Sequence, residues 1–237
     1  MKRRYFLVSF SILIFNFFIG VPFSQASVIT AKATFEGQAP VAEKIKADAD
    51  PKCKLIHPQG IQPEEVIVNS NGTLKNVFVY VKEGLGGQTF EAPKTSVVFD
   101  QQGCAYHPHV FGIRTGQTLE ILNSDETLHN VHALPANSQQ FNLGMPLKGM
   151  KLKKTFAKPE VMVKIKCEVH PWMRAFAGVL DHPFFGVTGD QGTAEIQNLP
   201  PGAYTLEAWH EKYGTQTQTI TVVADQNQEV AFNFKAA

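Results

Sequence analysis

The sequence predicts an all-β protein built from sandwich or barrel units. Short runs rich in Val, Ile, Phe and Thr recur along the chain, and Gly, Pro, Asn and Asp separate them. No window of a dozen residues carries a sustained helical stripe with caps. Short alternating runs bounded by turn residues are typical of β-sandwiches and barrels.

Six of these runs are predicted as strands before residue 181. Many of them alternate apolar with polar residues, as a strand with one buried face does. They span residues 30–35, 74–81, 96–99, 118–122, 161–166 and 176–180. A single helical turn can open at residues 63–65.

A second unit is predicted to begin near His182 and Pro183. From Val187 to His210 the chain reads as three strands joined by an Asp-Gln-Gly turn and a Pro-Pro-Gly turn. Residues 217–223 and 230–234 supply two more strands. This stretch resembles the small β-sandwich called a carboxypeptidase regulatory-like domain, in which a Leu-Pro-Pro-Gly-x-Tyr turn recurs. The resemblance implies a structural module and no particular chemistry.

The N-terminus has the pattern of a secretory signal peptide. Basic residues at positions 2–4 precede an apolar run over residues 5–21, and small residues stand at positions 24 and 26, before the expected cleavage site. We therefore expect cleavage after Ala26 and a mature protein that is periplasmic or otherwise secreted. A retained N-terminal membrane anchor is the alternative.

Charge and hydropathy limit the partners of the mature chain. Cleavage removes three basic residues and no acidic ones, so the formal net charge changes from +1 to −2. That balance disfavours a nucleic-acid partner. Because no second long apolar run follows, we expect no stable membrane insertion of the mature chain.

Three cysteines remain in this exported chain. An odd count in an oxidising compartment is most simply explained by one disulfide, between Cys53 and Cys104, with Cys167 left as a thiol protected by metal. The alternative is a second metal site of zinc type. In that site, His107 and His109 would join Cys53 and Cys104 as ligands, with His57 as a further candidate.

The segment Cys167-Glu-Val-His170-Pro-Trp-Met173 contains three candidate metal ligands, and His129 upstream is a fourth. A thiolate, two imidazoles and a thioether suit copper, because the sulfur ligands favour Cu(I) while imidazole tolerates both oxidation states. His132 is the main competitor for the first ligand, although strand alternation would send it and His129 to opposite faces. The candidate metal ligands are therefore His129, Cys167, His170 and Met173.

At this point the chain resembles the cupredoxin family, in particular its plastocyanin-like and pseudoazurin-like members. Their signature is an early His followed by Asn-Val, then Cys-x-x-His and a downstream Met, and the resemblance covers residues 99–181. It implies a Greek-key β-sandwich with His129, Cys167 and His170 as equatorial ligands and Met173 as axial ligand. It also implies that Asn130 pins the ligand loop through hydrogen bonds.

The ligand loop departs from this family in its length. Plastocyanin-like loops have four residues between the His and the Met, whereas only Pro171 and Trp172 separate them here. A shorter loop would lengthen, tilt or strengthen the contact between the metal and Met173, which is therefore the least secure ligand. Trp172 is expected to be a packing lid over the site.

Several residues near the motif have ordinary structural interpretations. Met145 and Met150 are expected to fill gaps in the core or in loops. Lysines at positions 148, 151, 153 and 154 form a short basic cluster. Such a cluster is typical of a solvated edge strand, but beside the copper face it could steer an acidic redox partner.

The predicted organisation is a signal peptide at 1–26, a cupredoxin-like domain at 27–182 and a smaller carboxypeptidase regulatory-like β-sandwich at 183–237. Residues 28–95 could pack on either unit. The expected function is non-enzymatic one-electron transfer by one copper ion, to or from a redox protein such as a cytochrome. A multicopper enzyme would need more clustered histidines than the single pair His107-x-His109. Copper storage or delivery, and a β-sandwich interaction module without metal, are the alternatives.

Overall fold

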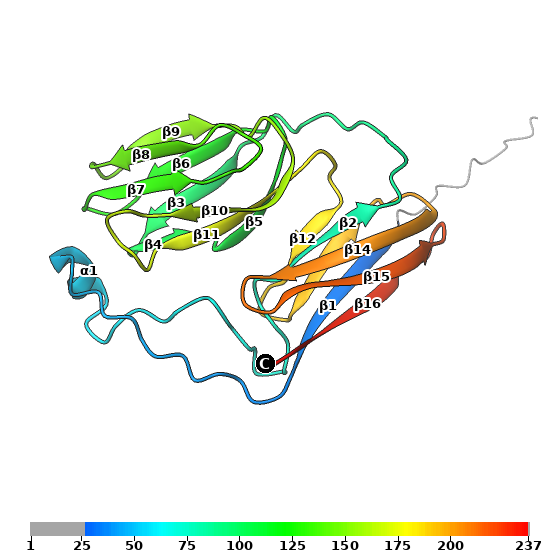
Figure 1. Cartoon of the computed structure of the whole chain (residues 1–237), viewed down its shortest axis with the longest axis horizontal. Helices are drawn as coiled ribbons and strands as arrows, with labels where there is room; N and C mark the ends of the chain where they lie inside the picture. Colours follow the sequence, from blue (N-terminus) through cyan, green and yellow to red (C-terminus); the bar gives the residue numbers. More distant parts are fainter. Residues whose placement is uncertain (1–26, 237) are drawn as a thin grey trace, which may run out of the picture.

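The computed structural model describes residues 27–236 and confirms the all-β prediction. Its strands form four sheets, which pack in pairs as two β-sandwiches lying side by side (Figure 1). The predicted signal peptide lies outside the described residues. Within residues 27–236, no helix is long and apolar enough to cross a membrane.

The first sandwich carries the predicted copper motif. One of its sheets has the order β5-β11-β10-β7-β8, with β5 (Val110–Arg114), β11 (Arg174–Leu180), β10 (Glu160–Lys166), β7 (His129–Ala133) and β8 (Phe141–Met145). The other has the order β4-β3-β6-β9, with β4 (Ala105–His107), β3 (Val97–Gln102), β6 (Leu119–Asn123) and β9 (Lys151–Lys154). Alternate residues of these strands turn inward, so that Phe99, Ile121, Val131 and Ile165 fill the space between the sheets.

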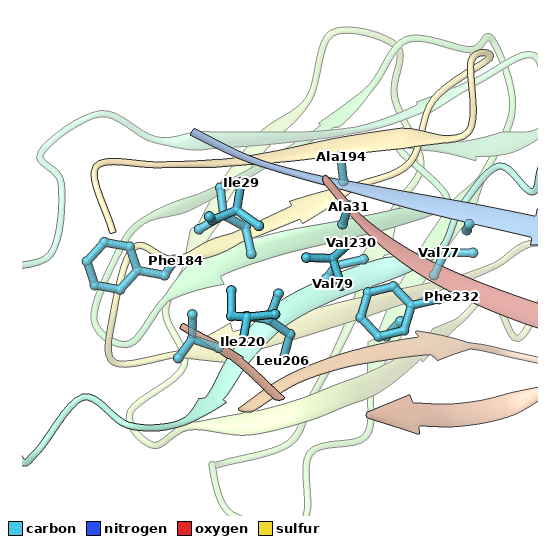
Figure 2. Packing of buried hydrophobic residues seen from close by; sticks show 14 of the residues in the cluster. Ile29, Ala31, Val77, Val79, Phe184, Ala194, Leu206, Ile220, Val230 and Phe232 are labelled. Carbon is cyan, nitrogen blue, oxygen red and sulfur yellow. The ribbon is translucent and has the colours of Figure 1, made fainter. Parts of the chain in front are cut away.

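The second sandwich combines strands from both ends of the chain. Its sheets have the orders β13-β1-β16 and β12-β2-β14-β15. The strands are β1 (Val28–Glu36), β2 (Phe78–Glu83), β12 (Phe185–Val187), β13 (Thr193–Gln197), β14 (Gly202–His210), β15 (Gly214–Val222) and β16 (Gln228–Lys235). Figure 2 shows Ile29, Val79, Leu206 and Phe232 gathered in its core.

The first two strands of the chain belong to the second sandwich and not to the predicted first domain. The prediction assigned residues 27–182 to one unit, but β1 pairs with β13 and β16, and β2 pairs with β12 and β14. The buried faces of β1 and β2 are completed only by strands that follow residue 184, which is why local sequence could not assign them. The first sandwich is thus inserted between β2 and β12 of the second.

Two glycines lie in the contact between the sandwiches. Gly112 of β5 and Gly178 of β11 are directly paired in the first sandwich. A side chain at Gly112 would meet the ring of Phe185, and one at Gly178 would meet the ring of Phe78. These two rings stack on each other with their centroids 5.8 Å apart. The missing side chains therefore make room for two aromatic rings of the second sandwich.

The segment from residue 37 to residue 77, which we call the strap, joins β1 to β2. It extends from the second sandwich to the end of the first, where it forms the helix α1 (Pro51–Ile56) (Figure 1). Asp50 caps this helix by accepting hydrogen bonds from the backbone N–H groups of Lys52 and Cys53. The helical turn predicted at residues 63–65 is wrong, since no helix forms there.

Candidate metal centre

The segment from Cys167 to Met173 is a tight loop between β10 and β11. The Cys167 N–H donates to the carbonyl oxygen of Met173 at 3.1 Å, and the Met173 N–H donates to that of His170 at 2.9 Å. The Cys167 sulfur also accepts the backbone N–H of His170 at 3.3 Å. These bonds turn the side chains of Cys167 and His170 toward the same point.

His129 reaches this point from another strand. It begins β7, which pairs with β10 directly before the loop. The Nδ1 atoms of His129 and His170 lie 3.0 Å apart, and the Cys167 sulfur lies 3.8 Å from Nδ1 of His170. His129 and His170 are completely buried and Cys167 nearly so. Three of the four predicted ligands therefore converge, with candidate ligand atoms within 4.8 Å of one another.

These separations fit donors that share one metal ion. Metal–nitrogen bonds of about 2.0 Å and metal–sulfur bonds of about 2.3 Å keep two nitrogen ligands within about 4 Å and a nitrogen–sulfur pair within about 4.3 Å. The two separations measured, 3.0 Å between the imidazole nitrogens and 3.8 Å between sulfur and nitrogen, are below these limits. The three residues can therefore hold a metal of the type that binds imidazole and thiolate.

Two carboxylates, missed by the sequence analysis, face the outer edges of the imidazoles. Nε2 of His129 lies 2.8 Å from Oδ2 of Asp125, and Nε2 of His170 lies 3.2 Å from Oδ2 of Asp50. An ionised carboxylate only accepts hydrogen bonds, so each Nε2 carries a proton, and each ring in its neutral form offers its Nδ1 lone pair to a metal. Asp125 precedes His129 by four residues, but Asp50 is far away in sequence and no local signal indicated it.

The protonation equilibria of these groups follow from burial and hydrogen bonding. Burial by itself would raise the pKa of the Cys167 thiol, but hydrogen bonds from His129, His170 and backbone N–H groups lower that pKa to about 6. Burial opposes the charged form of His129, yet hydrogen bonds with Asp125 and Cys167 raise the pKa of His129 to about 8. The site thus favours a thiolate beside positive charge, the form in which cysteine binds metals.

The carboxylates also remain ionised despite their partial burial. Hydrogen bonds from Thr127, from His170 and from backbone N–H groups lower the pKa of Asp50 to about 2, against the effect of burial. Burial opposes the ionised form of Asp125 too, but His129 and the N–H groups of Cys104 and Gly103 lower the pKa of this carboxyl. An ionised carboxylate therefore lies behind each of the two imidazoles, at the Nε2 atom.

Three further residues lie in or against the ligand loop: Asn130 of β7, Trp172 and Met173. Asn130 accepts the backbone N–H of Glu168 at 2.8 Å, which ties β7 to the ligand loop. The Trp172 ring lies 5.1 Å from that of His170 and donates its N–H to the carbonyl oxygen of Cys104. Met173 is buried in the core beside the loop, with 1% of its surface exposed. Its role as a ligand stays a prediction.

His132 and Met145 have other roles. His132 lies 2.6 Å from a carboxylate oxygen of Glu168 and is partly exposed, on the opposite face of β7 from His129. Met145 is the strand partner of His129 on β8 and is fully buried, and its sulfur accepts a hydrogen bond from Gln101. The competing ligand choice at His132 is therefore not supported by the geometry.

The predicted disulfide between Cys53 and Cys104 is confirmed. It excludes the alternative zinc-type site, whose histidines have separate partners. His57 contacts the carbonyl oxygen of Gly103, and His107 contacts that of Gln102. His109 contacts Glu211 of the second sandwich at 2.6 Å. The disulfide joins α1 of the strap to the turn between β3 and β4, next to the metal centre.

The basic cluster divides between two places. Lys151, Lys153 and Lys154 belong to β9, which is the edge strand of its sheet. Lysines at such a position discourage pairing with other sheets. Lys148 lies 3.6 Å from Glu126, which also pairs with Lys52 of α1. The edge-strand interpretation therefore accounts for most of the cluster.

Comparisons with known proteins concern separate parts of the chain. The family model of the carboxypeptidase regulatory-like domain matches residues 183–235. This match confirms the predicted C-terminal module, which β1 and β2 complete as a sandwich. Comparison with curated protein sequences gave no match.

Solved copper proteins resemble part of the chain. A copper-containing nitrite reductase from Thermus scotoductus is 23% identical at a TM-score of 0.33, over 40% of this chain and 24% of the reductase chain. A purple cupredoxin from Nitrosopumilus maritimus is 23% identical at a TM-score of 0.30, over 35% of this chain and 98% of its own. A Cu(I) form of an amicyanin mutant is 22% identical at a TM-score of 0.32, over 41% of this chain and 96% of its own.

Proposed function

We propose that this chain is an exported protein that binds one copper ion and carries single electrons. His129, Cys167 and His170 would hold the ion, with Met173 as a fourth ligand. The observation that carries the proposal is the meeting of two imidazole Nδ1 atoms and one thiol sulfur inside the first sandwich. Each Nδ1 is free to bind metal because Nε2 of the same ring faces a carboxylate.

The donor set supports copper over other metals. A single thiolate with two imidazoles, joined by the thioether of Met173, would match both the softer and the harder oxidation state of copper. Structural zinc sites, by contrast, take four ligands from cysteine and histidine. Among the described residues, no further cysteine or histidine joins the group of candidate ligands formed by His129, Cys167 and His170.

When bound, copper supplies a one-electron couple between Cu(I) and Cu(II). The residues of the chain keep the donors in one arrangement through this change. His129 is fixed by β7, and Cys167 and His170 are fixed by the hydrogen bonds of their loop and by Asn130. A scaffold that prevents rearrangement of the ligands favours fast electron exchange.

The burial of the donors supports a carrier over a delivery protein or an enzyme. His129 and His170 have no exposed surface, and 4% of Cys167 is exposed. Release of copper to another protein would require the loop or the strap to open. The disulfide supports an exported, oxidising compartment, and we propose that the electron partner is another redox protein such as a cytochrome.

The optical spectrum of the mature chain, loaded with Cu(II), tests this function. A thiolate-to-copper transition gives intense visible absorption, which a zinc-loaded control cannot give. We expect a strong band at a stoichiometry of one copper per chain, and its bleaching by a one-electron reductant should be reversible. A colourless protein under these conditions would overturn the proposed function.

A further inference from the structure

We infer that Asp50 and Asp125 are positioning residues for the two histidine ligands, and that the Cys53–Cys104 disulfide ties the strap, which carries Asp50, to the β3–β4 turn, whose backbone Asp125 binds. This inference rests on the proposed function, because the histidines matter here as copper ligands. It assigns a part in the metal centre to the strap, whose residues lie outside the predicted motif at 99–181.

Asp50 approaches His170 from the strap. Its Oδ2 lies 3.2 Å from Nε2 of His170 and accepts a hydrogen bond from the Thr127 hydroxyl at 2.7 Å. Its Oδ1 accepts the backbone N–H groups of Lys52 at 2.7 Å and Cys53 at 3.1 Å. The capping residue of α1 is therefore also the hydrogen-bond acceptor for the imidazole.

Asp125 holds His129 in the same manner from the first sandwich. Its Oδ2 lies 2.8 Å from Nε2 of His129 and accepts the Cys104 N–H at 2.8 Å. Its Oδ1 accepts the Gly103 N–H at 2.8 Å. Each carboxylate thus binds one imidazole and the backbone of one disulfide cysteine.

The contacts close into a ring around the two histidines. It runs from His129 through Asp125, Cys104, Cys53 and Asp50 to His170, whose Nδ1 meets that of His129. The Cys53 sulfur itself lies 3.7 Å from Nε2 of His170. The disulfide links the two sides of this ring and thereby restrains the strap. Displacement of the strap would move Asp50 away from His170.

The two carboxylates act on the metal centre in two ways. As hydrogen-bond acceptors they select the tautomer in which Nδ1 is free and hold the ring orientation. As negative charges behind the ligands they stabilise Cu(II) more than Cu(I), and so lower the reduction potential. The loss of such a partner of a metal ligand typically weakens metal binding about 10- to 100-fold.

Substitutions at Asp50 separate these two effects. Asp50→Asn keeps an acceptor oxygen and removes the charge, whereas Asp50→Ala removes both. Asp48→Asn is the matched control, because Asp48 lies in the same strap, is largely exposed and pairs with Lys54 at the surface. Asp125→Asn repeats the test at the other histidine.

The first measurement needs no metal. In metal-free protein, nitrogen NMR of the histidine rings should show Nε2-protonated His170. Asp50→Ala should abolish that preference at His170 and leave His129 protonated at Nε2, because Asp125 is unchanged. If Asp50→Ala leaves the tautomer of His170 unchanged, Asp50 does not position this ring and the inference is wrong.

The second measurement uses copper-loaded protein. Asp50→Asn and Asp125→Asn should both raise the reduction potential above that of wild type and of Asp48→Asn. Asp50→Ala should in addition raise the copper dissociation constant about 10- to 100-fold. If the wild type has the visible copper band and these variants match Asp48→Asn in potential and affinity, the inference fails while the proposed function stands. A wild type without the band overturns the proposed function instead.

A third variant tests the part of the disulfide. Cys53→Ala combined with Cys104→Ala should change the tautomer of His170 as Asp50→Ala does, and it should raise the reduction potential of the copper-loaded protein. Circular dichroism and a thermal scan identify any variant that fails to fold. Asp50 lies on the strap, outside both sandwich cores, so we expect its variants to fold. They can therefore decide the test even if Asp125→Asn is unfolded. A double variant that folds and retains the wild-type tautomer and potential would exclude the disulfide from the ring.

Discussion

The sulfur of Cys167 lies 3.8 Å from Nδ1 of His170 and accepts the backbone N–H of the same residue. One short loop thus brings together the softest donor of the site and one of its imidazoles. Burial opposes ionisation of the Cys167 thiol, but hydrogen bonds from His129, from His170 and from the Val169 N–H lower its pKa to about 6. The chemistry of the site depends on this sulfur more than on any other single atom.

Cys167→Ser should abolish the visible copper band and leave a folded β protein. In the proposed copper site the thiolate would be both the chromophore and the ligand that selects copper, and a serine hydroxyl is not ionised at neutral pH. Absorption and circular dichroism spectra of the copper-loaded variant measure the two effects. An undiminished band would remove Cys167 from the ligand set.

His129→Ala should weaken copper binding far more than His132→Ala does. Nδ1 of His129 faces His170 inside the core, whereas His132 contacts Glu168 on the outer face of the same strand. Copper content after dialysis, with the absorption spectrum, compares the two variants. Equal losses, or a larger loss for His132→Ala, would reverse this choice of ligand.

Removal of the disulfide should destabilise the protein without removing copper. The bond joins cysteines 51 residues apart, and the loss of loop-closure entropy in the unfolded chain corresponds to about 4 kcal/mol. Urea unfolding of Cys53→Ala combined with Cys104→Ala measures the change in the free energy of unfolding. As a check on the linkage itself, mass spectrometry of the oxidised wild type should find one Cys53–Cys104 peptide and only Cys167 open to alkylation.

Gly178→Ala should destabilise the contact between the sandwiches by about 1–3 kcal/mol, the range for overpacked cores. An added Cβ would lie 2.3 Å from the ring of Phe78, which is fully buried. Gly144→Ala is the matched control, since Gly144 also lies in a strand but has nothing within 4 Å of an added Cβ. Thermal unfolding of both variants provides the comparison, and equal midpoints would contradict the packing argument.

His210 should make the second sandwich less stable in mild acid. Burial lowers the pKa of His210 to about 4, well below that of an unfolded histidine. The unfolded chain therefore binds a proton that the native state cannot, and stability is lost as the pH falls from about 6.5 toward 4, by about 3 kcal/mol.

His210→Asn removes this titration and offers an acceptor for the N–H groups of Lys212 and Tyr213. Urea unfolding of wild type and variant at several pH values between 7.5 and 4.5 measures the difference in slope. If both proteins lose stability equally across this range, another group is responsible.

The sequence alone determined those features that depend on neighbouring residues. Alternation of apolar and polar residues indicated the all-β class, because strand side chains point alternately to opposite faces. The close spacing of Cys167 and His170 predicted the ligand loop, since residues three apart can turn toward one ion. The assignment of Cys167 to this motif left Cys53 and Cys104 as the predicted disulfide pair, which the structure confirms.

One local feature was present in the sequence but was missed. Asp50 followed by Pro51 is a capping residue with proline at the first helical position, which is a recognised start signal for a helix. The helix that follows has only six residues, too few to show a hydrophobic period. A signal of this kind is easily overlooked when helices are sought by periodicity.

Tertiary structure alone decided the features that depend on which surfaces meet. The strands β1 and β2 are apolar on their buried faces and would fit either sandwich, and only their pairing with β16 and β14 assigns them to the second. Asp50 reaches His170 across 120 residues of sequence, through the strap and the disulfide. Local composition cannot encode such contacts, because their free energy comes from burial and hydrogen bonding between segments that become neighbours only in the folded chain.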